Sequence, residues 1–478
     1  MTVSVLSDES APSFVLSLLP AFGASSALTP EDERRLGAVV EALVRFTLEH
    51  AYPDHELGEI EVTLEADEGF VRVVVHDWGL PLKSAGGDLG PLPEPLATLA
   101  AETRGLQLVN LGSEGKRLTA EVAAGSTAAG PIGHHVADAP HRGRTGAGAP
   151  DVVEVRAGTA DDAEAIAQLL YENYHLSYVH GDFYRPRYLT AELDSGRLVS
   201  TVAVHEGRVI GHHALMPLSG SPSAETGAAV VDSAYRGLGI FGRMFEHTLD
   251  AARGRDLAAV FGDAVTIHPF SQRAESAHGY RESALQLGMV PARTSMRGFG
   301  HEGPERRTAT LRSYRPLDES VRPASLPTSY RELLESAYEN LGLSVEDRAK
   351  PVEPEGEAVT ATLDGARALG ALRLRRWNGD TRAELERAVR HLLSRHVDVV
   401  YGDVDLATVE DLDDAVAELN ELGFFAAGLV LHGPDGHDHL RLQLLDSEEI
   451  ELEKIVCHSP YGESLRQQVL EDKTRVVG

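Results

Sequence analysis

In the middle third of the chain, segments whose apolar residues recur at every second position alternate with segments whose apolar residues recur about every 3.6 positions. Alternating apolar and polar residues predict strands, and apolar residues at i, i+3 and i+4 predict helices. Glu206-Gly207 separates two alternating runs and predicts a hairpin turn. The predicted elements, in order, are strand 153–156, helix 163–170, a hairpin of strands 198–204 and 209–215, strand 225–231, a glycine-containing loop over 232–242, helix 243–253 and strand 264–267.

The flanking segments show the same two periods. Upstream they predict a helix over 34–51, a hairpin of 59–63 with 71–75, and the start of a helix over 102–110. Downstream, Thr308–Tyr314 alternates like a strand. The remaining predicted elements are strand 368–374, helix 381–395, strand 397–405, helix 409–422, and strands 423–432 and 439–445.

Two breaks divide the chain. Gly, Ala and Pro dominate residues 121–150 without apolar periodicity, which is typical of a linker. A weaker break lies at 300–327. The predicted domains are 1–122, 151–300 and 301–478, with a flexible linker over 123–150. The linker residues His134, His135 and His141 could bind a metal ion, but we expect no metal site because a linker holds them on no fixed scaffold.

Composition narrows the possible functions. The 478 residues carry a net charge of −30, which argues against nucleic-acid binding and favours a cationic substrate such as an amine. There is neither a long apolar run nor a basic start before an apolar stretch, so we expect no membrane association and a cytoplasmic location. The single cysteine, Cys457, excludes an internal disulfide framework and is a poor candidate nucleophile.

The loop Arg236-Gly-Leu-Gly-Ile-Phe-Gly242 carries the most specific chemistry. Gly237 and Gly239 allow the backbone to approach a ligand closely, and the following helix presents unpaired N–H groups and a positive dipole end. Together these features make a cradle for a pyrophosphate. A Gly-x-Gly before a helix is a weak signal when taken alone.

The surrounding residues strengthen that signal. The loop resembles the acyl-CoA-binding motif of GNAT N-acetyltransferases, and Phe270–Tyr280 followed by Leu285–Met289 resembles that family's next helix and closing Gly-aromatic pair. The resemblance implies binding of acyl-CoA, most simply acetyl-CoA, and direct acyl transfer to an amine in a ternary complex. Phe241 departs from the family's small residue and could crowd the pyrophosphate. The implied cofactor-binding residues are Val230, Val231, Arg236, Gly237, Leu238, Gly239, Ile240, Phe241, Gly242 and Ser271.

The reaction needs a deprotonated amine and a proton for the leaving thiolate. Glu225 stands eleven residues before Arg236, where some members of the family have a general base. Asp232 is a second candidate, although it could equally cap the turn. The family's tyrosine acid has no clear match here: Glu275 falls near its place, and His268, Ser271 and Tyr280 are substitutes by residue type only. The predicted catalytic residues are Glu225, Asp232, His268 and Tyr280.

The first 122 residues resemble the GHKL ATPase fold, particularly the anti-sigma-factor kinases. The resemblance lies in Glu49–Pro53, Asp77-x-Gly79 and Arg104-Gly-Leu106, and it implies a site for ATP. The family's Mg²⁺-binding asparagine has no counterpart, so nucleotide binding without turnover and a purely structural domain both remain open. The implied nucleotide-binding residues are Glu41, Asp77, Gly79, Arg104, Gly105 and Leu106.

The last segment ends its second helix with Leu422-Gly-Phe424, which repeats the closing feature of the GNAT pattern without an Arg-x-x-Gly-x-Gly loop. We therefore expect a multidomain α/β (α+β) protein, in which a GHKL-like α/β sandwich precedes tandem GNAT-like mixed-sheet domains. The second of these should be degenerate and wall the substrate cleft of the first. Asp435, His437 and His439 are either site residues or a polar hairpin.

Two functions fit these observations. The first is an acyl-CoA-dependent N-acyltransferase acting on an amine of a small molecule or peptide. The alternative is a regulatory protein that senses nucleotide or acyl-CoA and binds a protein partner through its anti-sigma-like domain.

Overall fold

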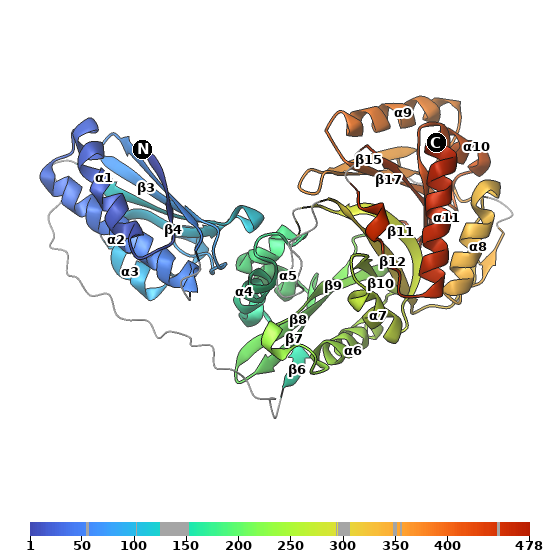
Figure 1. Cartoon of the computed structure of the whole chain (residues 1–478), viewed down its shortest axis with the longest axis horizontal. Helices are drawn as coiled ribbons and strands as arrows, with labels where there is room; N and C mark the ends of the chain where they lie inside the picture. The colour runs from blue at the N-terminus through green and yellow to red at the C-terminus, as the bar shows by residue number, and fades with distance from the viewer. Residues whose placement is uncertain are drawn as a thin grey trace.

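The computed structural model describes residues 1–53, 57–101, 103–124, 153–292, 294, 306–347, 351–353, 356–446 and 450–478. Three units follow one another along the chain, coloured from blue to red in Figure 1. The linker histidines fall outside the described residues. No helix in the described part is long and apolar enough to cross a bilayer.

The N-terminal unit is a five-stranded antiparallel sheet packed against helices. Its alternating strands turn one face toward a core shared with α1 and α2. The Thr29 hydroxyl and the Asp32 carboxylate bond each other's backbone N–H and so begin α2. In sheet order the strands are β1 (Thr2–Leu6), β2 (Glu59–Asp67), β3 (Phe70–Asp77), β5 (Lys116–Ala123) and β4 (Arg104–Asn110), and the helices are α1 (Ala11–Ser25), α2 (Pro30–Ala51) and α3 (Glu94–Ala100).

The helix predicted to start over 102–110 is wrong, because Arg104–Asn110 forms strand β4. Leu106, Leu108 and Asn110 face the core at every second position, which is a strand period. Gly105 has φ of +61° beside a register shift between Arg104 and Gln107, so this glycine serves a bulge rather than a helix start.

The middle and C-terminal units share one twelve-stranded sheet. The predicted hairpin, loop helix and following strands of the middle unit are all present, and α5 is an additional helix. The elements are β6 (Glu154–Ala157), α4 (Ala163–Tyr174), α5 (Pro186–Ser195), β7 (Val199–His205), β8 (Arg208–Pro217), β9 (Ser223–Val231), α6 (Ile240–Arg253), β10 (Ala259–Val265), α7 (Phe270–Ala277), β11 (Arg281–Val290) and β12 (Thr308–Pro316).

Strand β12 extends the middle unit beyond residue 300, its predicted end. The strand inserts between β10 and β11, so the chain pattern Thr308–Tyr314 belongs to the same sheet as the loop-bearing strands. We propose that the boundary between the two units follows Pro316.

The C-terminal unit contributes the other end of the sheet. Its predicted strands and helices are observed with small shifts at their ends. They are β15 (Val359–Asp364), β16 (Leu369–Leu374), α9 (Gly379–Leu393), β17 (Val399–Asp405), α10 (Leu412–Glu421), β18 (Phe425–Val430) and β19 (His439–Leu445), with α8 (Arg331–Asn340) and α11 (Pro460–Val477) packed against the region where the units meet.

The two units repeat one topology. The middle unit runs β9-α6-β10-α7-β11-β12 with sheet order β9-β10-β12-β11, and the C-terminal unit runs β16-α9-β17-α10-β18-β19 with order β16-β17-β19-β18. One pair of equivalent strands carries a similar short pattern, Val260-Phe-Gly-Asp263 in β10 and Val400-Tyr-Gly-Asp403 in β17. That the two domains are related stays a prediction, which this repeated topology motivates.

The repeats meet where β11 lies antiparallel to β18, at Ala284 and Gly428. A Cβ on Gly428 would lie 2.2 Å from the Ser283 carbonyl oxygen, so only glycine permits this approach. One apolar core runs through both repeats, from Phe261 and Tyr314 to Phe424 and Leu442. The C-terminal unit is therefore fixed against the middle one.

Two adjacent buried histidines on β8 make stability depend on pH. Burial lowers the pKa of His212 to about 4 and that of His213 to about 3. His212 is held by the Ser200 hydroxyl and the Ala228 carbonyl oxygen at 2.9 and 2.8 Å. Both rings are therefore neutral in the folded state at neutral pH.

Because the folded pKa lies below the unfolded one, the unfolded chain binds more protons below pH ~6.5. Stability is full above that pH and should fall as pH decreases, by about 2 kcal/mol per histidine between pH 7 and 5. Urea unfolding of the wild type and of His212→Asn across this range tests this. The variant should show a shallower slope, and an equal slope would contradict a neutral buried His212.

Candidate active site

The sheet opens between β9 and β10. These parallel strands pair only at the start of β9, from Ser223 with Ala259 to Glu225 with Phe261. Farther along, β9 stays paired with β8, but a register shift beside Ala228 bends it, and Ala228 has φ of +47°. Such a bulge re-aims a strand and costs roughly 1–3 kcal/mol of backbone strain.

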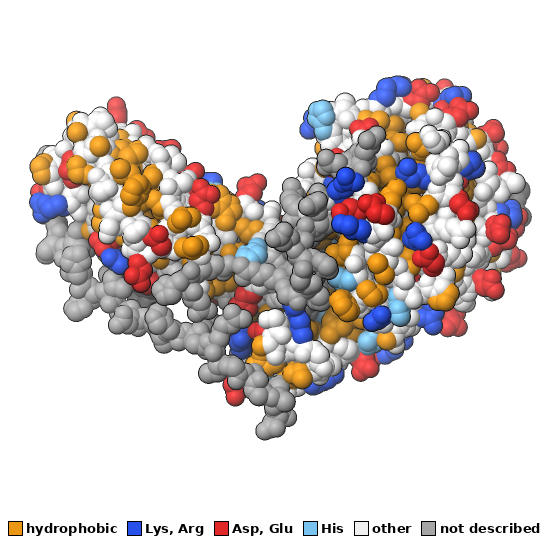
Figure 2. Space-filling model, viewed as in Figure 1, with side chains coloured by type: hydrophobic (Ala, Val, Ile, Leu, Met, Phe, Trp, Pro, Cys, Tyr) orange, Lys and Arg blue, Asp and Glu red, His pale blue; other side chains and the backbone are white. Residues whose placement is uncertain are grey.

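A cavity of about 850 Å³ occupies the opening. Its lining includes Gly227–Val231 of β9 and Ala264 and Val265 of β10. The far wall comes from the C-terminal unit, including Thr362, Arg367 and Tyr401. In Figure 2 the outline of the molecule is notched between the N-terminal and C-terminal units.

The glycine loop lies at the end of β9. Gly237 and Gly239 have φ of +79° and +74°, and Gly239 begins α6 without any side-chain cap. A Cβ on either glycine would meet no atom within 4 Å, so this face of the loop is open. Arg236 ties the loop to the strand and to α4, because its guanidinium donates to the Val231 carbonyl oxygen at 3.2 Å and to Asn173 Oδ1 at 2.7 Å. The uncapped N–H groups at the start of α6 suit an anion.

Phe241 does not cover this face. Its ring packs on Phe245 and His213, with ring centroids 5.6 and 5.8 Å apart. The side chain therefore points to the core side of α6, and it lines the cavity. Of the other loop residues, Leu238 is exposed and Ile240 is buried in the core.

The equivalent place in the C-terminal repeat is closed. Strands β16 and β17 stay paired from Leu369 with Val399 to Leu374 with Val404. The start of α9 is capped by the Asn378 side chain, which accepts from the N–H groups of Asp380 and Thr381 at 3.0 and 3.1 Å. This repeat therefore has neither the opening nor the free helix N-terminus.

The structure separates the four predicted catalytic residues. Glu225 and His268 line the cavity, as does the predicted cofactor contact Ser271. Glu225 Oε1 lies 3.7 Å from His180 Nε2. Asp232 and Tyr280 are not among the lining residues.

Asp232 and Tyr280 have structural contacts instead. Asp232 accepts from the Ala234 N–H at 2.9 Å and pairs with Arg208 at 2.6 Å, so it caps the turn. The Tyr280 hydroxyl is 2.9 Å from Thr226 Oγ1, and the side chain is buried. These contacts favour structural roles for Asp232 and Tyr280.

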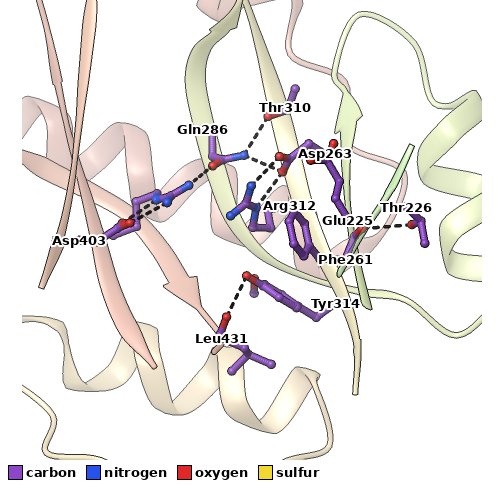
Figure 3. A network of polar contacts seen from close by, with 12 residues as sticks. Glu225, Thr226, Phe261, Asp263, Gln286, Thr310, Arg312, Tyr314, Asp403 and Leu431 are labelled. Atoms are coloured by element: carbon purple, nitrogen blue, oxygen red, sulfur yellow. Dashed lines mark hydrogen bonds and ion pairs between the residues drawn. The ribbon is translucent and has the colours of Figure 1, made fainter. Parts of the chain in front are cut away.

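A polar network forms the floor of the cavity and joins the repeats (Figure 3). Arg312 binds Asp263 through two hydrogen bonds, at 2.9 and 2.6 Å, and Arg441 binds Asp403 in the same way, at 2.7 and 2.8 Å. The two pairs occupy equivalent positions, since Asp263 on β10 lies opposite Arg312 on β12 and Asp403 on β17 lies opposite Arg441 on β19. Gln286 links them, donating to Asp263 at 2.7 Å and accepting from Arg441.

Sequence reasoning missed this network and many of the cavity residues, among them Tyr178, Thr362 and Arg367. The repeated Gly-Asp of β10 and β17 was the available signal for the network. Tyr178, whose hydroxyl accepts from the Ala228 N–H at 3.0 Å, follows α4 in a segment without a pattern. Thr362 and Arg367 belong to the other repeat, and no local pattern could have assigned them to this cavity.

A second hollow, of about 1180 Å³, adjoins the cavity. Both share Tyr178, His180 and Arg367 in their linings. Leu111–Glu114 of the N-terminal unit form one wall of this groove. That unit is held against α4, where Lys83 N donates to Glu164 Oε1 and Gln168 Nε2 donates to the Pro81 carbonyl oxygen, both at 3.2 Å.

The residues predicted to bind nucleotide do not form a site. The Asp77 carboxylate is buried and pairs with buried Lys116 at 2.5 Å. A Cβ on Gly79 would lie 2.2 Å from the Ala51 carbonyl oxygen, so this glycine serves packing. Glu41 pairs with Arg45 one turn along α2, on the surface. Arg104, Gly105 and Leu106 lie in strand β4. The described residues also hold no group suited to a metal ion.

Residues 163–274 match the family model described as acetyltransferase (GNAT) family. The middle unit thus contains a GNAT acetyltransferase domain, and this match favours the enzyme over the regulatory alternative. No curated protein matches the chain.

Solved structures similar to part of the chain include the ribosomal-protein-S18-alanine N-acetyltransferase of Escherichia coli. It is 12% identical, with 35% of this chain and 96% of that chain covered and a TM-score of 0.28. The ribosomal-protein-S5-alanine acetyltransferase of Vibrio fischeri is 18% identical, with 35% and 94% covered and a TM-score of 0.28. The phosphinothricin acetyltransferase of Sinorhizobium meliloti, in complex with acetyl-CoA, is 19% identical, with 35% and 90% covered and a TM-score of 0.28.

Lys116→Met tests the interpretation of the N-terminal unit. Burial lowers the pKa of Lys116, and its ammonium is held by Asp77. Removing the ammonium leaves a buried, uncompensated carboxylate, so we expect a loss of about 3–5 kcal/mol in the free energy of unfolding. The exposed pair of Glu41 with Arg45 provides the control. Arg45→Ala should change the free energy of unfolding by less than about 1 kcal/mol, because an exposed ion pair contributes little. Urea unfolding measures both. Because Lys116 already pairs with the Asp77 carboxylate, ATP with Mg²⁺ should leave the melting temperature of the wild type unchanged. A rise in that temperature would contradict this interpretation.

Proposed function

We propose that this protein transfers an acetyl group from acetyl-CoA to an amine of a small molecule or peptide, by direct attack within a ternary complex. The opening of β9 from β10 carries this proposal. It leaves strand edges on both sides of a cavity, with the uncapped helix α6 at one end and Glu225 on its lining.

The residues present fit acetyl-CoA. The start of α6 and the loop from Arg236 to Gly242 would hold the pyrophosphate, with Ser271 contributing from α7. An N–H near Val230 or Val231 would polarise the thioester carbonyl, because this edge of β9 has left β10. Acetyl-CoA itself supplies the activated acyl group.

Glu225 would accept the proton from the attacking amine. It lies on β9 just where pairing with β10 ends, and its side chain borders the cavity near His180. A positioned carboxylate can do this work because the proton leaves as nitrogen bonds carbon.

A covalent route through cysteine is disfavoured. Burial raises the pKa of Cys457 to about 11, so its thiol keeps its proton at neutral pH. Cys457 is also absent from the lining of both hollows. Attack by the amine on acetyl-CoA itself requires no such intermediate.

The acceptor would enter by the groove beside the N-terminal unit, since this groove adjoins the cavity near His180 and Glu225. The net charge of −30 would favour the approach of a protonated amine. In this arrangement the N-terminal unit shapes the acceptor route and needs no nucleotide.

Glu225→Gln tests the proposal. Calorimetric titration should show acetyl-CoA binding to wild type and variant with equal affinity, since Glu225 lies away from the glycine loop. A screen of small amines and peptide N-termini should find an acceptor whose turnover falls about 100-fold or more in the variant. Glu246→Gln, an exposed carboxylate on α6, is the control and should retain full activity.

The outcomes separate the parts of the proposal. A wild type that does not bind acetyl-CoA would contradict the acyl-CoA site itself. Binding and transfer that survive Glu225→Gln would remove Glu225 as the base and leave the site in place.

A further inference from the structure

One arginine beside the cavity has no partner among the described residues. Arg373 lies on β16 and is half-buried. Its Nε atom has no solvent-exposed surface and donates no hydrogen bond. The guanidinium group also makes no ion pair with a described carboxylate, whereas its neighbours Arg375 and Arg441 each make one. A partly buried cation without a partner lowers the stability of the fold, so its presence calls for a ligand.

The surroundings of Arg373 hold more positive than negative charge. The charged groups that act on it most are Asp403, Arg375, Asp435 and Arg441. Arg441 binds Asp403 at 2.7 Å. Arg375 binds Asp435 at 2.8 Å. Three guanidinium groups therefore share two carboxylates, and one positive charge lacks a counterion. Burial lowers the pKa of Arg373, and so do the two other arginines, whereas the two carboxylates raise it.

Arg373 continues the lining of the cavity along β16. Ala371 is exposed and lines the cavity, and Arg373 follows it on the same face, because side chains of a strand alternate between faces. Across the sheet Arg373 lies opposite Asp403 of β17, whose partner Arg441 is itself a lining residue. Helix α9 packs on the other face of β16, within the apolar core. The unpartnered guanidinium is thus on the cavity side of the sheet.

We propose that Arg373 binds a carboxylate of the acceptor, so that the preferred acceptor is a peptide with an acidic residue a few positions after its N-terminal amine. A guanidinium group can hold a carboxylate through two parallel N–H···O bonds. This inference rests on the proposed function, since it names the class of acceptor for that same acyl transfer.

The charge near Arg373 favours a carboxylate as the ligand. One positive charge without a counterion matches one singly charged anion. A doubly charged phosphate would add repulsion from Asp403 and Asp435, which act on the same guanidinium group.

The position of Arg373 favours a peptide. The reacting amine belongs at the opening of β9 from β10, near Glu225, whereas Arg373 lies on β16 in the other repeat. A free amino acid carries its amine and its carboxylate on one carbon atom and cannot reach both places. An extended peptide can, because each residue adds about 3.3–3.6 Å of length.

Peptides with an N-terminal alanine and an amidated C-terminus test the proposal. Each carries either one glutamate or one glutamine, placed at successive positions along an otherwise neutral sequence. In the wild type, glutamate at the best position should raise kcat/KM for acetyl transfer about 10-fold or more over glutamine, which is typical of a hydrogen bond to a charged group.

Arg373→Met removes the guanidinium group and retains the apolar stem. This variant should turn over the glutamate and glutamine peptides equally, and Arg373→Lys should restore part of the preference because it retains the charge without the paired donors. Arg390→Met is the matched control. Arg390 is exposed on α9, on the other side of the sheet, so its loss should leave the preference intact.

Two measurements separate ligand binding from a structural role. Calorimetric titration with the N-acetylated peptides, which need no turnover, should show tighter binding of the glutamate peptide to the wild type and equal binding of both peptides to Arg373→Met. Urea unfolding of Arg373→Met should show a midpoint no lower than that of the wild type, because no described partner loses a bond.

Equal kcat/KM for glutamate and glutamine peptides at every position of the wild type would overturn the assignment, and so would a preference that survives Arg373→Met. A lower urea midpoint, with equal losses for both kinds of peptide, would give Arg373 a structural role instead. A phosphoserine peptide preferred over the glutamate peptide would overturn the choice of a carboxylate.

The proposed function and this inference can fail separately. A wild type that binds no acetyl-CoA would contradict the proposed function, whereas Arg373-dependent binding of the acetylated glutamate peptide would still support the carboxylate site. If no peptide is turned over, the acetylated peptides decide, and binding that does not distinguish glutamate from glutamine overturns the assignment.

Discussion

The site depends on the parting of two parallel strands. Strands β9 and β10 share a sheet, yet they stop pairing after Glu225 and Phe261. Backbone groups left unpaired and shielded from water are costly, at about 1–3 kcal/mol each, so such an opening persists only where something holds it and something can fill it. The bend at Ala228 holds it here, together with Tyr178 bonded to the Ala228 N–H.

The C-terminal repeat shows the same topology without the opening. Its strands β16 and β17 remain paired, and the Asn378 side chain caps the first N–H groups of α9. In the middle repeat the corresponding helix start, at Gly239, has no side-chain cap. The repeat still contributes to the cavity: Thr362 and Arg367 wall it, and the pair Asp403–Arg441 is joined to Asp263–Arg312 through Gln286. One topology thus occurs twice, once with an opening between its strands and once without it.

The sequence was sufficient where local periodicity decides structure. The alternation around Glu206-Gly207, the amphipathic helix after Gly239 and the strand before Asp232 all form as predicted, and the loop between them lies at the cavity. The sequence was insufficient where a short motif is compatible with two kinds of secondary structure. Gly105-Leu106 fits a helix start and also a bulged strand, and the alternate burial from Leu106 onward selected the strand.

Partners distant in sequence account for the remaining differences. Asp77 resembled a ligand-binding aspartate, but Lys116, thirty-nine residues later, neutralises it. Asp232 and Tyr280 had suitable chemistry and lie close to the site, yet Arg208 and Thr226 bind them.

Hydrogen–deuterium exchange with and without acetyl-CoA tests the central claim most directly, because it reports on both repeats in one molecule. The account predicts that acetyl-CoA slows amide exchange over 227–231 and 237–242, in the opened strand and the glycine loop, and leaves residues 376–381, the equivalent loop and helix start of the C-terminal repeat, unchanged. Slowed exchange at 376–381, or no change at the glycine loop, would contradict it.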